Sequence, residues 1–129
     1  MVRCVFALLA ALCLGLAVFP ATAQVQRNFP AATLRGALVV ENGSEIRLNG
    51  EPARLAPGAR IRGQNNMLVM SNSLAGQRLL VHYTFDMQGQ VKDVWILTPG
   101  EAAKRPWPST PQEAERWEFD ISAQTWTQK

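Results

Sequence analysis

The chain has very little cysteine, and what it has lies near its start. Of 129 residues, only Cys4 and Cys13 are cysteines, and both precede residue 24. An exported domain without disulfides depends on its hydrophobic core for stability. A segment of about 100 residues is large enough for one such core but not for two. We therefore predict a leader over residues 1–23 and a single small domain over residues 24–129.

The leader has the three-part pattern of a secretory signal peptide. Arg3 supplies a positive charge, residues 5–19 form an apolar run, and an Ala-Thr-Ala cleavage signal ends at Ala23. An apolar run of about 15 residues is shorter than the ~20 residues of a membrane-spanning helix. No second run of this kind follows. The sequence thus predicts a periplasmic or secreted protein with no transmembrane segment after processing.

Groups that perform catalysis are also scarce. His82 is the only histidine, it lies in the middle of an apolar stretch, and the serines lack the context of an activated nucleophile. One histidine without cysteines matches no spacing of a transition-metal site. No phosphate-binding loop or dinucleotide fingerprint is present. We predict no catalytic residue, no metal site and no cofactor, and we interpret His82 as a structural, hydrogen-bonded residue.

Short strand-forming stretches alternate with turn signals along the first half of the domain. The expected strands are 37–41, 45–48, 59–62 and 67–70, the last of them buried. The turn signals between them are Asn42-Gly43, Asn49-Gly50, Pro57-Gly58 and the run from Gly63 to Asn66. This spacing is typical of an all-β fold, and we predict a small antiparallel β-sandwich or barrel.

The longest strand-forming tract runs from Arg78 to Leu97 and is interrupted once, at residues 86–89. Asp86 and Gly89 bracket the loop as in a type I turn followed by a left-handed glycine. We predict a central hairpin, partly covered on both sides, that pairs Phe85 with Val91 and Tyr83 with Asp93.

The residues after Leu97 change in character. Thr98-Pro99-Gly100-Glu101 and Thr110-Pro111-Gln112-Glu113 both place a capping threonine before a proline, with a glutamate three residues on. Each is expected to begin a short helical turn. Alternating aromatic residues beyond Arg116 predict a terminal strand or a strap over the core.

Arginines form the first candidate binding site. Arg60 and Arg62 flank an inward Ile61, so strand alternation places both on one outer face. Arg47 has the equivalent outward position between Ile46 and Leu48, and it joins the other two if the strands are neighbours. Guanidinium groups bind carboxylates and phosphates. We predict an anion- or partner-binding face of Arg47, Arg60 and Arg62.

Trp107 and Trp126 form a second candidate, an aromatic platform on which a sugar stacks. The alternative is burial, because a small core without disulfides uses its aromatic side chains for packing.

The passage from Leu55 to Pro108 contains LAPGARIRGQNN and LLVHYTFDMQGQVKDVWILTPGEAAKRPWP. It resembles a group of short exported proteins of unknown function from β-proteobacteria. The resemblance implies an exported bacterial domain and supplies no site residues.

These observations favour a non-catalytic periplasmic β-domain that binds an acidic ligand or an envelope protein. One alternative is a hydrolase of envelope polymers with carboxylates that the sequence does not identify, Asp93 and Glu101 being nominal candidates. Another is an inhibitor or assembly factor of an envelope protein. Nucleic acid is not an expected partner in this compartment, and the sequence gives no indication of oligomeric state.

Overall fold

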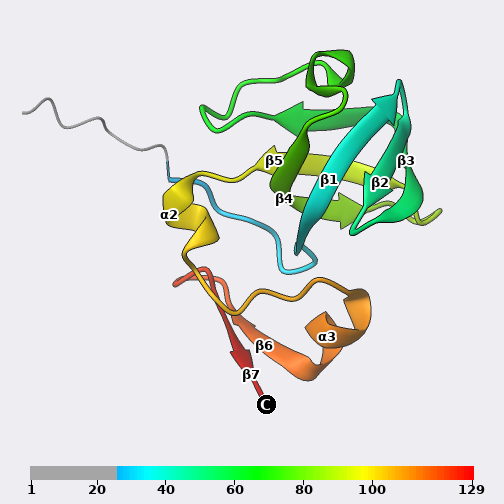
Figure 1. Ribbon diagram of the computed structural model, residues 1–129. Coiled ribbons are helices and arrows are strands. Elements are labelled where there is room, and N and C mark those ends of the chain that lie inside the picture. Colours follow the sequence, from blue (N-terminus) through cyan, green and yellow to red (C-terminus); the bar gives the residue numbers. More distant parts are fainter. Residues whose placement is uncertain (1–25) are drawn as a thin grey trace, which may run out of the picture.

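The computed structural model describes residues 26–129, so the predicted signal peptide lies outside the described residues. Five strands form a closed barrel in the order β1-β2-β3-β5-β4 (Figure 1). They are β1 (Leu34–Asn42), β2 (Glu45–Leu48), β3 (Glu51–Arg62), β4 (Arg78–Phe85) and β5 (Val91–Ile96). The barrel and the short helices that follow it confirm the predicted fold class.

Neighbouring strands of the barrel are antiparallel with one exception. β1 pairs with both β2 and β4, which closes the barrel, whereas β3 and β5 run parallel. The prediction of a fully antiparallel sheet is therefore corrected at this one pair. The chain thus forms a closed five-stranded barrel with one parallel strand pair. Such a fold supports many unrelated functions and does not by itself define one.

The central hairpin forms where it was predicted. Asp86 Oδ1 accepts hydrogen bonds from the backbone N–H groups of Gln88 and Gln90, both at 2.9 Å, and Gly89 has φ 78°. Phe85 pairs with Val91 as expected. Beyond that pair, an irregularity shifts the register by one residue, so Tyr83 lies opposite Val94 and not opposite Asp93.

This irregularity has a clear packing consequence. Val91 and Val94 are both fully buried, although strict alternation would turn residues three positions apart to opposite faces. A β-bulge inserts one extra residue between them, so that the side chain of Val94 points inward like that of Val91. The exposed Lys92 occupies the extra position.

Two further sequence-based predictions are wrong. Pro57-Gly58 does not end a strand; β3 continues through it, with a register shift between Leu55, opposite Val91, and Arg60, opposite Asp93. Residues 67–70 are not a buried strand, because this segment folds back outside the barrel onto the end of β3. Backbone bonds from Gly63 to Met67 and from Val69 to Ile61, both 2.8 Å, hold it there.

The C-terminal region, residues 97–129, forms a cap beside the barrel (Figure 1). It contains α2 (Pro99–Ala102), α3 (Pro111–Arg116) and a separate two-stranded sheet of β6 (Trp117–Asp120) and β7 (Thr125–Gln128). Thr98 and Glu101 form the predicted capping box, and Thr110 caps α3. A 3-10 helix, η2 (Ser71–Leu74), precedes β4. No helix within residues 26–129 has both the length and the apolar character needed to cross a membrane.

Two separate hydrophobic clusters result. The barrel core is mostly aliphatic and consists of Leu34, Leu38, Val40, Ile46, Leu48, Leu55, Ile61, Leu74, Val81, Tyr83, Val91 and Val94. The aromatic core lies between barrel and cap and is formed by Phe29, Leu97, Trp107 and Trp126, with Trp95, Trp117 and Phe119 packed against it. In Figure 1 the segment that carries Phe29 runs between the barrel and the cap.

Candidate functional site

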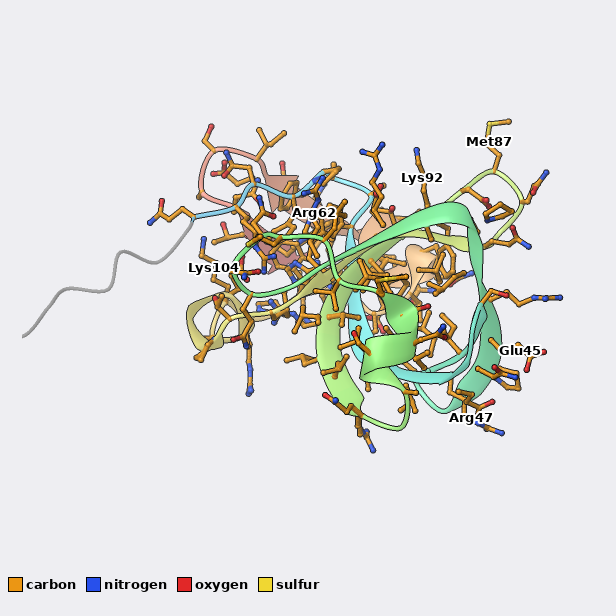
Figure 2. All side chains as sticks on the ribbon, turned by 90° about the horizontal axis from the view of Figure 1, so that it is seen from above. Glu45, Arg47, Arg62, Met87, Lys92 and Lys104 are labelled. Carbon is orange, nitrogen blue, oxygen red and sulfur yellow. The ribbon has the colours of Figure 1, made fainter. Side chains whose placement is uncertain are left out.

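The structure does not bring the three predicted arginines together. Arg47 on β2 lies opposite Pro52, and Arg60 follows Pro52 by eight residues on β3. Arg47 is thus level with the start of β3, whereas Arg60 lies beyond the register shift that follows Leu55. In Figure 2 the labels of Arg47 and Arg62 lie well apart. β2 and β3 are neighbours, as the prediction required. The prediction did not anticipate that β3 extends from Glu51 to Arg62, which places Arg60 and Arg62 beyond the part that pairs with β2.

The three arginines also differ in whether a carboxylate neutralises their charge. Arg47 forms an exposed ion pair with Glu41 and donates to the Gly50 carbonyl oxygen. The two ion pairs found within residues 26–129 are this one and Arg27–Glu101, so Arg60 and Arg62 have no carboxylate within 4.0 Å among those residues. The Arg62 side chain donates to the Asn66 carbonyl oxygen at 3.3 Å. Arg60 and Arg62 remain candidates for binding an anion.

Trp107 and Trp126 are not surface platforms. Their exposed fractions are 7 % and 6 %, and both belong to the aromatic core. Trp107 Nε1 donates to the Thr33 carbonyl oxygen at 3.0 Å, which fixes the indole against the N-terminal segment. Both tryptophans therefore serve the packing of the core, which was the alternative to a sugar-binding platform.

A groove of ≈ 400 Å³ opens beside the bend in β3. Its walls are the β1–β2 turn, residues of β3 between Leu55 and Ile61, and the segment from Leu68 to Ser71. We call it the β3 groove. Arg60 lies on it, and Leu68 and Met70 expose 66 % and 76 % of their surface at its edge. The misassigned segment 67–70 thus supplies an apolar rim.

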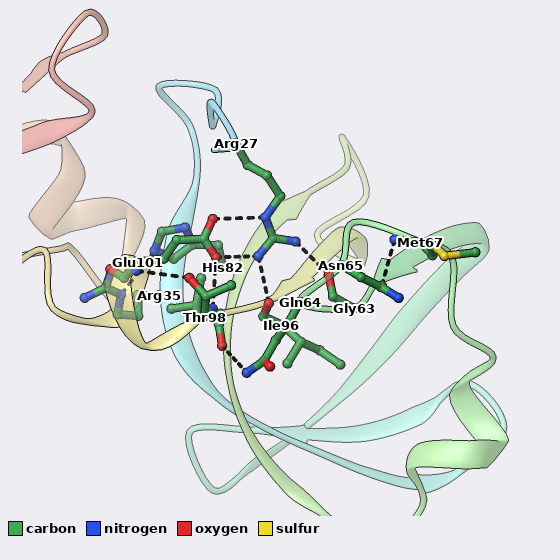
Figure 3. A network of polar contacts seen from close by, with 11 residues as sticks. Arg27, Arg35, Gly63, Gln64, Asn65, Met67, His82, Ile96, Thr98 and Glu101 are labelled. Atoms are coloured by element: carbon green, nitrogen blue, oxygen red, sulfur yellow. Dashed lines mark hydrogen bonds and ion pairs between the residues drawn. The ribbon is translucent and has the colours of Figure 1, made fainter. Parts of the chain in front are cut away.

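A buried polar network joins the N-terminal segment, the barrel and α2 (Figure 3). The Arg27 side chain is 4 % exposed, and its Nε donates to Glu101 Oε2 at 2.9 Å. Its other nitrogens donate to the carbonyl oxygens of Gly63 and Ile96. Arg27 therefore connects the N-terminal segment and α2 to the barrel.

Arg35 has a similar role beside the aromatic core. Its guanidinium donates to the carbonyl oxygens of Glu101, Ala102 and Lys104 at the end of α2. Its Nε donates to His82 Nε2 at 3.1 Å. Burial, with a further contribution from the nearby charge of Arg105, lowers the pKa of Arg35 to about 10, so its side chain still carries a charge at neutral pH.

His82 lies on the outer face of β4 beneath the cap and is 1 % exposed. Its ring stacks on Trp107 with centroids 4.2 Å apart, and Phe29 contacts it edge-on at 4.3 Å. Burial, together with the charges of Arg35 and Arg27, lowers the pKa of His82 to about 2. The imidazole is therefore neutral, and the hydrogen bond from Arg35 agrees with the predicted structural role.

Glu101 is the carboxylate at the centre of the network. Burial alone would raise its pKa, but hydrogen bonds from Arg27 and Thr98 and the charge of Arg27 hold it below the ordinary value. A general acid that acts near neutral pH needs the opposite shift. Within residues 26–129, no three His, Cys, Asp or Glu side chains are grouped as metal ligands.

Sequence reasoning missed the two arginines of this network. Arginines are seldom buried, so the sequence alone favours solvent for both. The capping box fixes Glu101 at the start of α2, but it does not indicate a partner 74 positions away.

These features define a class of structure, a small closed β-barrel with an aromatic cap. No family model, no curated protein and no solved structure matches the chain.

Proposed function

We propose that this chain is an exported, non-catalytic binding domain of the bacterial envelope. Its β3 groove takes an extended segment of an envelope protein that carries both apolar and acidic side chains. The observation that carries the proposal is the combination of an apolar rim with an arginine that has no carboxylate partner among residues 26–129.

The apolar rim supports a protein partner. Met67, Leu68 and Met70 expose 65 %, 66 % and 76 % of their surface on one short segment. Exposed apolar groups that lie together at a groove are characteristic of interaction sites. Methionine side chains are flexible and polarisable, so they adapt to different apolar partners.

The backbone of β3 supports an extended conformation of the bound segment. β2 pairs with β3 up to Arg54, and β5 pairs with Leu55 and again from Arg60. Residues 56–59 thus have no ladder partner among the described strands, and all of them except Pro57 line the groove. Unpaired backbone groups of this kind form hydrogen bonds with an added strand, although Pro57 supplies only its carbonyl oxygen.

The charge of the groove supports an acidic segment. Arg60 is exposed on the groove, and Arg62 follows on the same side of β3. The exposed Arg60 and the half-buried Arg62 attract carboxylates over a distance limited to ~10 Å at 0.1 M salt. Binding should therefore weaken as salt is added.

The alternatives are affected differently. A hydrolase is disfavoured at Glu101, since this carboxylate is held ionised by Arg27 and its pKa is lowered. An inhibitor or assembly factor would use the same groove, so that hypothesis differs from ours only in the consequence of binding.

A short peptide of alternating leucine and glutamate tests the proposal. In titrations followed by backbone amide NMR, we expect shifts at residues 55–61 and 68–71. A peptide with lysine in place of glutamate should bind about tenfold more weakly, and ~0.15 M salt should reduce the difference between them.

Matched variants locate the site. The triple variant Arg60→Gln, Leu68→Ser, Met70→Ser removes one charge and two exposed apolar groups from the groove. The variant Arg47→Gln, Met87→Ser makes the same kinds of change elsewhere on the surface, since Met87 is fully exposed in the hairpin loop. Only the first should lose binding. Equal binding by both variants, or equal affinity for the two peptides, would refute the proposal.

A further inference from the structure

A second cavity, of ≈ 370 Å³, lies between the barrel and the cap, away from the β3 groove. We call it the cap cavity. Its walls come from the N-terminal segment at residues 26–29, from α2 and its flanks, and from the turn at residues 122–124. His82 and Trp107 complete the lining. Its volume is at the small end of the range for ligand pockets.

His82, one of the residues that line this cavity, has a buried ring nitrogen without a hydrogen-bond partner among residues 26–129. Arg35 Nε donates to His82 Nε2, so Nε2 must be the unprotonated nitrogen of the neutral ring. The proton then lies on Nδ1. This atom is buried and has no hydrogen-bond partner within residues 26–129. Buried donors are nearly always paired in folded proteins, so an orphan in a cavity wall indicates a missing acceptor.

The charges around the cavity favour an anionic acceptor. Arg27, Lys104 and Glu101 line it, and Arg27 already neutralises Glu101. Lys104 is exposed at the opening, where its Nζ lies 3.4 Å from the Ala123 carbonyl oxygen. Arg35 adds a further positive charge behind His82. The cavity therefore carries an excess of positive charge.

The remaining surface indicates the type of anion. Phe29 and Trp107 supply an apolar, aromatic wall next to His82. The guanidinium groups of Arg27 and Arg35 are occupied by backbone carbonyl oxygens, by Glu101 and by His82. Bidentate recognition of a phosphate uses free arginine forks, which this arrangement does not offer. One N–H donor and one lysine suit a carboxylate better.

We propose that the cap cavity binds a small organic monocarboxylate. The carboxylate accepts the His82 Nδ1–H proton in a hydrogen bond, Lys104 pairs with its charge at the opening, and the apolar body of the ligand packs on Phe29 and Trp107. The cap cavity and the β3 groove share no lining residue, so the test of one site does not decide the test of the other.

The single histidine makes a direct test feasible. Protein labelled with ¹⁵N-histidine and carrying no histidine tag gives imidazole signals from His82 alone. We would titrate it with phenylacetate, with uncharged phenylacetamide of the same shape, and with inorganic phosphate. Phenylacetate should shift the Nδ1–H signal saturably, phenylacetamide should bind at least about tenfold more weakly, and phosphate should leave the signal unchanged.

Lysine variants provide the control. Lys104→Gln should weaken phenylacetate binding about tenfold without altering the Nδ1–H signal of the free protein. Lys92→Gln, an exposed lysine on β5 that lies apart from Lys104 in Figure 2, should have no effect. Both substitutions are at exposed positions, so folding is preserved.

Three results would overturn the inference. A proton found on Nε2 in place of Nδ1 removes the donor. Equal affinity for the acid and its amide, or phosphate binding as tight as phenylacetate, removes the selectivity for a carboxylate. No shift at ~20 mM phenylacetate, which excludes binding tighter than the millimolar range, means that water alone fills the cavity.

Discussion

The barrel core and the aromatic core differ in composition and in how the chain connects them. Nearly all residues of the barrel core come from strands whose backbones are hydrogen-bonded in a continuous ladder. β6 and β7 pair only with each other among the described strands. The cap is held against the barrel by a backbone bond from the Arg35 N–H to the Pro108 carbonyl oxygen, at 2.9 Å, and by the side chains of Arg27 and Arg35. The Gln124 side chain attaches the N-terminal segment to the cap.

Gln124 illustrates this second kind of connection. Its side-chain amide accepts from the Phe29 N–H at 2.7 Å and donates to the Phe29 carbonyl oxygen at 3.3 Å. The amide thus takes the place of a strand partner for one residue of the N-terminal segment. In a β-ladder the stabilisation is spread over many backbone hydrogen bonds, whereas the junction between cap and barrel depends largely on a few side chains. We therefore expect single substitutions to separate cap from barrel more readily than to disrupt the barrel.

The tryptophans make the two regions distinguishable by spectroscopy. All four, Trp95, Trp107, Trp117 and Trp126, belong to the aromatic core or pack against it. Tryptophan fluorescence consequently reports on the junction, and far-ultraviolet circular dichroism reports mainly on the strands of the barrel. Coincident unfolding by both probes would indicate a single cooperative unit.

Replacing Arg27 should have the largest effect. Arg27→Met leaves Glu101 partly buried without its partner and removes donors from two carbonyl oxygens. Breaking a buried ion pair in this way costs about 3–5 kcal/mol. We expect urea unfolding followed by fluorescence to shift to lower denaturant and to precede the change in circular dichroism.

The exposed ion pair is the matched control for this experiment. Arg47→Met breaks the pair with Glu41, in which both side chains are about half exposed. Surface pairs contribute about 1 kcal/mol or less, so both probes should stay close to wild type. If Arg27→Met unfolds with coincident probes, the cap and barrel are one cooperative unit and the contrast drawn above is wrong.

A truncation in the barrel core should act differently. Leu38 on β1 is fully buried, and Leu38→Ala is expected to destabilise the protein by about 3 kcal/mol through lost burial and a residual cavity. Because the cap rests on the barrel, both probes should shift together. A fluorescence transition that stays at the wild-type urea concentration would contradict this expectation.

The pH dependence of stability isolates His82. Its pKa is lowered to about 2 in the folded protein and is about 6.5 in an unfolded chain, so the unfolded state binds more protons between these values. Stability is therefore complete above pH ~6.5 and falls as the pH decreases. The slope approaches ~1.4 kcal/mol per pH unit, or about 2 kcal/mol between pH 6.5 and 5.

Urea unfolding at pH 7.5 and pH 5 measures this loss of stability. Both pH values lie above the pKa of ordinary carboxylates, so those groups contribute little to the difference. His82→Gln should be less stable than wild type at the higher pH but lose most of the difference between the two conditions. An unchanged pH dependence in this variant would show that another group is responsible.

The smallest loss of stability is expected from removing a hydrogen bond between Tyr83, a residue of the barrel core, and the cap. Tyr83 Oη donates to the Ser109 carbonyl oxygen at 2.8 Å. Burial raises the pKa of Tyr83 to about 12, so the hydroxyl remains a donor throughout the usable pH range. Tyr83→Phe should cost about 1 kcal/mol by either probe. A loss several times larger would mean that this bond, and not Arg27, is the main connection.

Local signals in the sequence were sufficient for most elements of the fold. Asn49-Gly50, with φ of 54° and 83°, forms the turn that its composition predicts, and Thr98 with Glu101 starts α2. These features depend on residues close together in the chain, where backbone preference and capping act directly. The bulge at Lys92 was not predictable in this way, since it serves burial on a face that exists only in the closed barrel.

The candidate sites show the opposite balance. The sequence correctly placed Arg60 and Arg62 on one side of a strand, because alternation is a local rule. It failed for Arg47, since the continuation of β3 through Pro57-Gly58 decides the distance. It also failed for Met67 and Met70, whose apolar character suggests burial but whose segment has no place inside a barrel already filled by other side chains.

The sequence by itself determined the class of fold, the helix caps, the scarcity of catalytic groups and most of the turns, Pro57-Gly58 being an exception, because each of these follows from residue type and short-range spacing. Only the tertiary structure decided which polar groups meet. Arg27 and Glu101 are 74 positions apart, and Arg35 and His82 are 47 apart. Their pairing depends on strand order and on the docking of the cap. Contacts over such separations are set by the packing of the whole chain, to which no local preference gives access.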